Sequence, residues 1–69
     1  MSIVDGAKIT KLREQLGITM TELADYAGIT LAMMQYTEQG KRTPNIGTLA
    51  LIARKLGTTV DELLREPTE

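Results

Sequence analysis

Apolar residues recur at helical spacing along most of the chain. Ile9, Leu12 and Leu16 are spaced i, i+3, i+7, which predicts a helix from about Asp5 to Leu16. Two later segments, starting after Thr19 and Asn45, repeat the pattern. Their predicted inward faces are Leu23, Ala24 and Ala27 in the first, and Ile46, Leu49, Ile52, Ala53 and Leu56 in the second. The periodicity predicts amphipathic helices packed around one core, and no segment shows the alternation typical of a strand.

Capping residues and glycines divide these segments. Thr19 with Glu22, and Thr59 with Glu62, fit the T-x-x-E capping box, while Thr30 and Asn45 are helix caps. A glycine follows each of the first four helical stretches, at Gly17, Gly28, Gly40 and Gly57. The expected fold is all-α: a compact five-helix domain over residues 1–66. The fifth helix follows Thr59 with Val60, Leu63 and Leu64 turned inward, and residues 67–69 form a frayed tail.

The segment from Thr19 to Gly40 contains two short helices joined by a glycine turn at Gly28. This arrangement is typical of a helix-turn-helix, in which the second helix enters the major groove of DNA. The sequence therefore predicts that helices 2 and 3 form a DNA-binding unit.

Composition removes several classes of chemistry. The 69 residues include neither cysteine nor histidine, so disulfides, zinc sites and imidazole catalysis are not expected. We therefore expect no enzyme, no cofactor and no metal. The sequence also lacks an apolar run long enough for a membrane span and the apolar stretch of a signal peptide, which favours a cytoplasmic protein without membrane contact.

The charge balance weakens the case for a strong electrostatic attraction to DNA. The net charge is −1, whereas nucleic-acid-binding domains are usually basic. The acidic surplus is concentrated after residue 57, and residues 1–57 have seven basic against five acidic side chains. A DNA-binding surface formed by the first part of the chain is thus compatible with the composition.

The motifs of the chain resemble those of the Cro/CI-type, or XRE-like, phage repressors. They are L-R-E-Q-L-G at 12–17, T-E-L-A at 21–24, A-G-I-T at 27–30, E-Q-G-K-R-T-P at 38–44 and L-A-L-I-A-R-K-L-G-T-T-V-D-E-L-L at 49–64. The resemblance implies a lambda-repressor-like fold and sequence-specific binding of double-stranded DNA by a bacterial or phage-encoded, nucleoid-associated transcriptional regulator, usually a repressor. It also implies an ion pair between Arg13 and Glu38.

The same resemblance makes Met34 the buried residue of the third helix. At about 100° per residue, Ala32 and Tyr36 then lie on the opposite side. The residues expected to face DNA bases are Leu31, Ala32, Met33, Gln35 and Tyr36. Relatives often carry hydrogen-bonding side chains there, but three of these residues are apolar. They suit contact with the C5-methyl group of thymine, and Gln35 suits adenine.

Polar residues around the third helix are expected to contact phosphates. Relatives usually have glutamine after the second helix cap, but here that residue is Met20, which can offer only its backbone amide. The candidate phosphate contacts are Thr19, Met20, Thr21, Thr30, Gln39, Lys41, Arg42 and Thr43. The resemblance further implies a homodimer that binds two half-sites about 34 Å apart. Val60 and Leu64 lie near the family's dimer surface.

The apolar surface of the third helix is also compatible with three other interpretations. It suits a protein partner, as in an interaction module or an antitoxin-like domain. In a second interpretation, the helix is rotated about its axis, so that Leu31 or Met33 belongs to the core. Finally, the pattern is compatible with a redesigned or laboratory-selected recognition helix.

Overall fold

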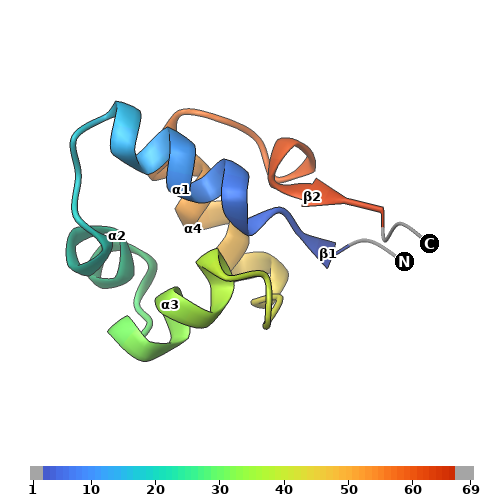
Figure 1. Cartoon of the computed structure of the whole chain (residues 1–69), viewed down its shortest axis with the longest axis horizontal. Helices are drawn as coiled ribbons and strands as arrows, with labels where there is room; N and C mark the ends of the chain where they lie inside the picture. Colours follow the sequence, from blue (N-terminus) through green and yellow to red (C-terminus); the bar gives the residue numbers. More distant parts are fainter. Residues whose placement is uncertain (1–2, 67–69) are drawn as a thin grey trace.

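The computed structural model describes residues 3–66, in which four α-helices enclose a single core (Figure 1). In chain order the elements are strand β1 (Ile3–Val4), helices α1 (Gly6–Gln15), α2 (Met20–Ala27), α3 (Leu31–Glu38) and α4 (Ile46–Leu56), the 3-10 turn η1 (Asp61–Leu63) and strand β2 (Leu64–Arg65). All four α-helices match the positions expected from the sequence, with α1 shorter by one residue at each end than the expected range. The mostly helical architecture is confirmed, but the expected number of helices is not.

Each α-helix begins directly after a residue whose side-chain oxygen accepts a backbone N–H three positions further on. This bond satisfies one of the amides that a helix start leaves without a partner. The four caps are Asp5, Thr19, Thr30 and Asn45. The helix starts are therefore determined by local sequence, which explains why they could be predicted.

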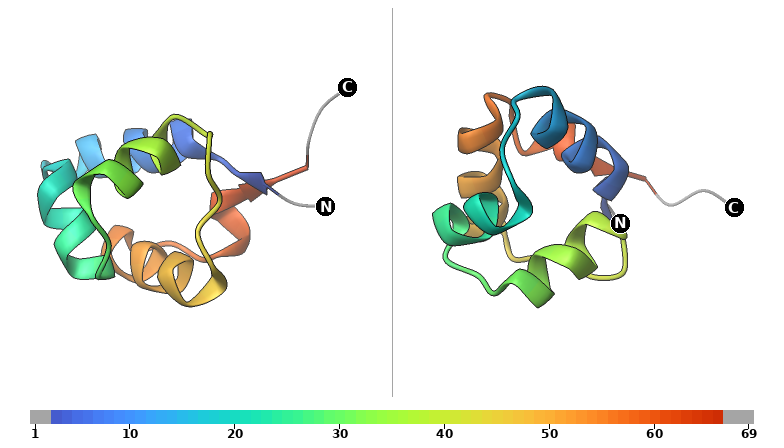
Figure 2. Two further views of the ribbon diagram at one scale, coloured as in Figure 1. Left: turned by 90° about the horizontal axis from the view of Figure 1, so that it is seen from below. Right: turned by 60° about the vertical axis from the view of Figure 1, so that its left-hand side comes forward.

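The core forms where the apolar faces of the helices meet. Helix α2 packs against both α3 and α4, and α1 packs against α3, so that the helices surround a shared interior (Figure 2). The buried apolar residues are Val4, Ile9, Leu23, Ala24, Ala27, Met34, Leu49, Ile52, Ala53, Leu56 and Leu63. Most of these are the inward positions expected from periodicity.

The fifth helix expected after Thr59 is not confirmed as an α-helix. After Val60 the chain makes only the short turn η1 and then becomes extended in β2. Half of the predicted capping box does form, because the Glu62 amide donates to Thr59 Oγ1 over 3.2 Å. The Glu62 carboxylate instead accepts from Lys8 Nζ at 2.7 Å.

The expectation that the chain contains no strands is also wrong. Strands β1 and β2 form an antiparallel pair with Ile3 opposite Arg65 and Val4 opposite Leu64. The pair lies at the end of the molecule away from α2 (Figure 1). The Asp5 amide continues this connection by donating to the Leu63 carbonyl over 2.7 Å.

Two residues expected in the core are at the surface. Leu16 follows the last residue of α1 and is 53% exposed, and Ile46 is the first residue of α4 and is 67% exposed. Both lie at a helix end. Val60 and Leu64 are half-buried and pack against the core, as expected, whereas Leu51 faces outward on α4.

Within residues 3–66, the helices are too short and too polar to cross a bilayer. The frayed tail expected at residues 67–69 lies outside the described part of the chain.

Candidate nucleic-acid interface

A tight turn sets the angle between α2 and α3. Gly28 ends α2 with a φ of 72°, a conformation that costs other residues steric strain. The following Ile29 amide donates to the Ala24 carbonyl at 3.0 Å, and Thr30 then caps α3. The two helices are thus joined by only three residues in defined conformations, as a helix-turn-helix requires.

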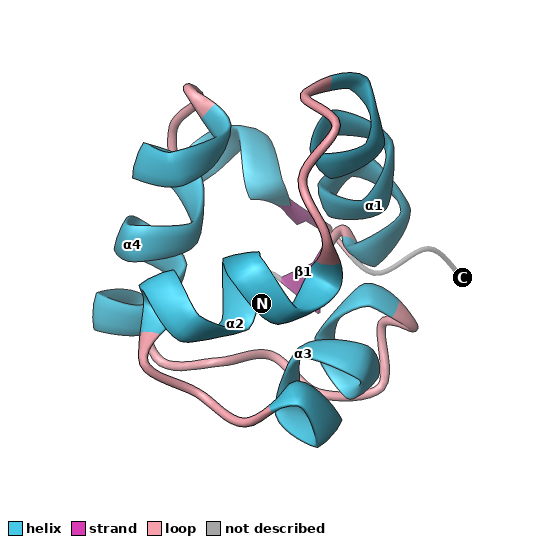
Figure 3. Ribbon diagram, turned by 90° about the vertical axis from the view of Figure 1, so that its left-hand side faces the viewer, coloured by secondary structure: helices cyan, strands magenta, loops and turns pink. Residues whose placement is uncertain are grey.

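Two buried side chains determine which face of α3 points outward. Met34 and Thr37 are fully buried, and the Thr37 hydroxyl donates to the Met33 carbonyl at 2.9 Å. Leu31 is 42% exposed and Tyr36 is 46% exposed. The outer side of α3 is free of other elements (Figure 3).

The alternative in which α3 is rotated, so that Leu31 or Met33 belongs to the core, is therefore wrong. Leu31 is exposed, and Met33 is half-buried but lies outside the core cluster. Ala32 and Gln35 are exposed beside Tyr36. The residues expected to read bases thus share one accessible surface of α3, of which Met33 forms the margin.

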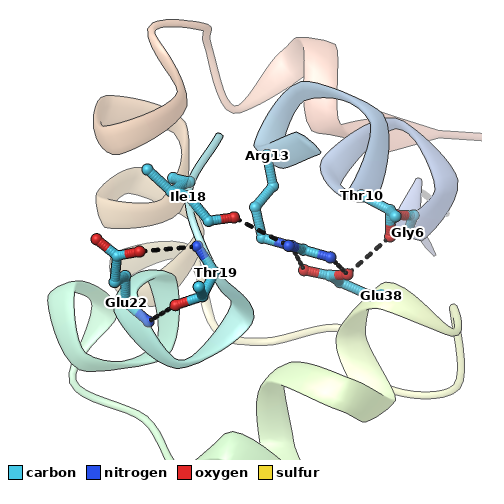
Figure 4. Close-up of polar contacts among 7 residues, drawn as sticks. All are labelled: Gly6, Thr10, Arg13, Ile18, Thr19, Glu22 and Glu38. Carbon is cyan, nitrogen blue, oxygen red and sulfur yellow. Dashed lines mark hydrogen bonds and ion pairs between the residues drawn. The ribbon is translucent and has the colours of Figure 1, made fainter. Parts of the chain in front are cut away.

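The ion pair expected between Arg13 and Glu38 is present and connects α1 to the end of α3 (Figure 4). Arg13 Nε lies 2.8 Å from Glu38 Oε2, and Arg13 Nη2 lies 3.2 Å from Glu38 Oε1. The two side chains are only 13% and 5% exposed. At this burial an unpaired charge would be costly, so the pair holds the two helices together.

Two further contacts around this pair were not expected from the sequence. The Thr10 hydroxyl donates to Glu38 Oε1 at 2.8 Å, and Arg13 Nη1 donates to the Ile18 carbonyl at 3.0 Å. Thr10 stands three residues before Arg13 on the same helix face, which is the signal that could have identified it. Arg13, which belongs to α1, therefore contacts both α3 and the loop that precedes α2.

At the start of α2, the capping box is complete. The Thr19 amide donates to Glu22 Oε1 at 2.9 Å, and the Glu22 amide donates to Thr19 Oγ1 at 3.0 Å (Figure 4). The hydrogen bond from the Thr19 amide lowers the pKa of Glu22, so that a carboxylate stands at this helix start. The amides of Met20 and Thr21 occupy first-turn positions that have no partner within a helix.

Two residues of the expected phosphate-binding set also make contacts within the fold. The Met20 side chain is half-buried and packs against the core, so only its amide is available to DNA. The Thr43 hydroxyl accepts the Val4 amide at 3.2 Å and thereby holds β1 against the loop after α3. This contact spans 39 residues of sequence, and no local pattern indicates it.

The remaining members of that set surround α3. Thr21, Thr30, Gln39, Lys41 and Arg42 are exposed, and the Thr30 hydroxyl accepts the Met33 amide at 3.1 Å. Residues 31–38 include no basic side chain, and the loop that follows contains the basic residues Lys41 and Arg42. The arrangement is an uncharged helix surface with a helix start on one side and a basic loop on the other.

Comparison with known proteins agrees with this geometry. A family model described as "Helix-turn-helix" matches residues 9–63. The HTH-type transcriptional regulator PuuR of Escherichia coli K12 is 28% identical over 65 residues, which are 94% of this chain and 35% of PuuR. The chain thus spans about a third of the length of that relative.

Two solved proteins share the fold. The N-terminal DNA-binding domain of SinR from Bacillus subtilis has a TM-score of 0.78 and 29% identity over 93% of this chain and 94% of that one. SinR in complex with DNA has a TM-score of 0.75 and 27% identity, covering 84% and 94%. The P22 c2 repressor has the same fold, with a TM-score of 0.84 and 24% identity over 90% and 94%. The chain belongs to the helix-turn-helix family, and its fold is that of the P22 c2 phage repressor.

Proposed function

We infer that this protein is a transcriptional regulator that binds double-stranded DNA sequence-specifically and acts as a repressor by blocking access to its site. The observation that carries this function is the free outer face of α3, held by a short turn to α2 and by the Arg13–Glu38 pair to α1. The helix-turn-helix family and the relatives described as transcriptional regulators support the same conclusion.

In this function α3 lies in the major groove. Gln35 is the residue of its surface best suited to a bidentate hydrogen bond, which favours adenine, and Tyr36 adds one hydroxyl. Leu31, Ala32 and Met33 have no hydrogen-bond donor and no strong acceptor in their side chains, and they suit the C5-methyl group of thymine. The half-site should therefore be rich in A·T pairs.

Backbone groups and the basic loop hold the phosphates. The amides at the starts of α2 and α3 carry the positive end of each helix dipole, which favours an anion. Lys41 and Arg42 provide ionic contacts on the other side of α3. The Glu22 carboxylate opposes the phosphate near α2, so the electrostatic attraction to DNA should be modest.

The test is duplex binding as a function of salt. Lys41 and Arg42 would neutralise about two phosphates per protomer, so log K should fall against log[salt] with a slope of about −2 for a monomer and about −4 for a dimer. Fluorescence anisotropy with a labelled A·T-rich duplex measures the slope. Gln35→Ala should reduce the preference for the specific duplex over a scrambled one and leave the slope unchanged.

The exposed apolar residues of α3 favour one other candidate function, which is docking of a protein partner on the same surface. Leu31 and Tyr36 are 42% and 46% exposed on the same helix, and contiguous exposed apolar residues often mark protein contacts. A domain of this second kind would show no salt-dependent affinity for a duplex, so the same experiment distinguishes the two functions.

A further inference from the structure

The outer surface of α3 has no ionised side chain. Leu31, Ala32 and Tyr36 are exposed, and Met33 borders them. Glu38 is the only charged residue of this helix, and its side chain is 5% exposed and paired with Arg13. The commonest specific contact of DNA-binding proteins, arginine or lysine with guanine, is therefore unavailable to α3.

This surface is also held in place. Thr30 fixes the start of α3, the buried Met34 fixes its rotation, and the Glu38 contacts fix its end. A single methyl group is recognised only by apolar atoms that already stand at the right position, because each contact contributes little. A rigid apolar helix surface meets this requirement better than a flexible loop.

The major groove offers such a surface one apolar feature, which is the methyl group on C5 of thymine. Cytosine methylated at C5 carries the same group on the same ring atom. The two bases differ at the neighbouring position, where thymine has the O4 acceptor and cytosine the N4 amino donor. The Gln35 side chain has both a carbonyl and an amino group, so it can pair with either.

We propose that the α3 surface recognises the C5-methyl group itself, so that 5-methylcytosine can replace thymine and cytosine methylation increases the affinity of this protein for DNA. This proposal rests on the proposed function. It adds a regulatory input, because the same DNA sequence would be bound more tightly when methylated. Leu31, Ala32 and Met33 are its specificity-determining residues.

The experiment uses one duplex recovered from a random library by selection with this protein. Each thymine in the site is replaced singly by deoxyuridine, which removes only the methyl group. The most sensitive T·A pair is then replaced by C·G and by 5-methylcytosine·G. Burial of one methyl group predicts a loss of about fourfold in affinity with deoxyuridine and a gain of about fourfold for 5-methylcytosine over cytosine.

Two variants show whether the effect comes from α3. Leu31→Gln should reduce the thymine-to-deoxyuridine affinity ratio towards one. Leu51→Gln is the matched control, because Leu51 is 37% exposed, close to the 42% of Leu31, but lies on α4. The ratio should stay unchanged in this control.

Equal affinity for thymine and deoxyuridine would overturn the inference and leave the proposed function intact. A loss with deoxyuridine without recovery by 5-methylcytosine would also overturn it, because the surface would then recognise thymine as a base. Failure to bind any duplex, at low salt as well, would remove the proposed function and the inference together.

Discussion

At the scale of single residues, the position of α3 depends on close contacts with α1. Arg13 and Glu38 form a nearly buried ion pair. Beside it, Gly6 lies so close to the end of α3 that a Cβ atom would stand 2.6 Å from the Thr37 carbonyl oxygen and closer still to that of Glu38. These contacts bring the start of α1 against the backbone of α3.

Removing one partner of the ion pair should be strongly destabilising. Glu38→Ala leaves the Arg13 guanidinium buried without its carboxylate, which costs about 3 kcal/mol. For a domain of this size, that lowers the Tm by more than roughly 10 °C. Thermal unfolding followed by circular dichroism measures the change. Glu14→Ala, which removes an exposed glutamate of α1, should leave the Tm nearly unchanged, and equal Tm values for both variants would contradict this role of the pair.

The close approach at Gly6 gives a second test. Gly6→Ala should destabilise the domain by about 1–3 kcal/mol, because the added methyl group meets backbone atoms of α3. Gly47→Ala in α4 is the matched control. A Cβ atom added at Gly47 would lie 3.4 Å from Asn45 Oδ1, which is an ordinary contact. The higher helix propensity of alanine should therefore dominate, and the variant should be more stable by roughly 0.5–1 kcal/mol. Urea unfolding of the two variants should therefore show opposite signs.

Local chemistry made some residue roles predictable and left others hidden. The capping oxygens of Thr19 and Thr30 act within three residues, so the sequence indicates them. The Thr43 hydroxyl instead accepts the amide of Val4, 39 positions away. A threonine in a polar loop looks the same in either role until the fold brings β1 beside it.

At the scale of elements, periodicity and caps predicted α1, α2, α3 and α4, because each has a cap and an apolar face of its own. Periodicity and caps could not predict where an apolar helix face has no neighbouring element to pack against. Leu16 and Ile46 were therefore wrongly assigned to the core. The fifth helix failed for a related reason. The carboxylate that would have completed its cap binds Lys8, 54 residues away, and the chain continues as β2.

The Lys8–Glu62 contact can be tested by titration. The hydrogen bond and charge of Lys8 lower the pKa of Glu62 below its ordinary value. The stabilisation from this contact is therefore present above the ordinary glutamate pKa and is lost as the pH falls through the lowered one. In Lys8→Met the pKa of Glu62 should rise to its ordinary range, as measured by NMR titration of the carboxyl carbon. An unchanged pKa would contradict the contact.

The loop after α3 should act through phosphates alone. Lys41→Ala and Arg42→Ala should each weaken duplex binding for every sequence and reduce the salt slope by about 0.9. Anisotropy titrations over a range of salt concentrations measure both effects. Arg54→Ala on the outer side of α4 is the control with the same loss of charge, and it should change the slope less. If either variant changed the sequence preference and left the salt slope unchanged, that side chain would contact bases, which would contradict the prediction.

At the scale of the whole molecule, the fold presents α3 at one edge and places the acidic residues Asp61 and Glu62 in η1, away from that edge (Figure 1). This separation makes a net charge of −1 compatible with DNA binding. The sequence predicted the helix-turn-helix and the outward surface of α3. The base contacts and the homodimer stay predictions, because they depend on a partner as well as on this chain.

The most direct test of the account is selection of duplexes from a randomised library with the purified protein, followed by sequencing of the enriched pool. The account predicts a short motif rich in A·T pairs whose enrichment is lost in Gln35→Ala and Tyr36→Ala. Two copies of the motif about one helical turn apart would indicate a homodimer. A pool without enrichment at low salt would contradict the DNA-binding function and assign the apolar surface of α3 to a protein partner.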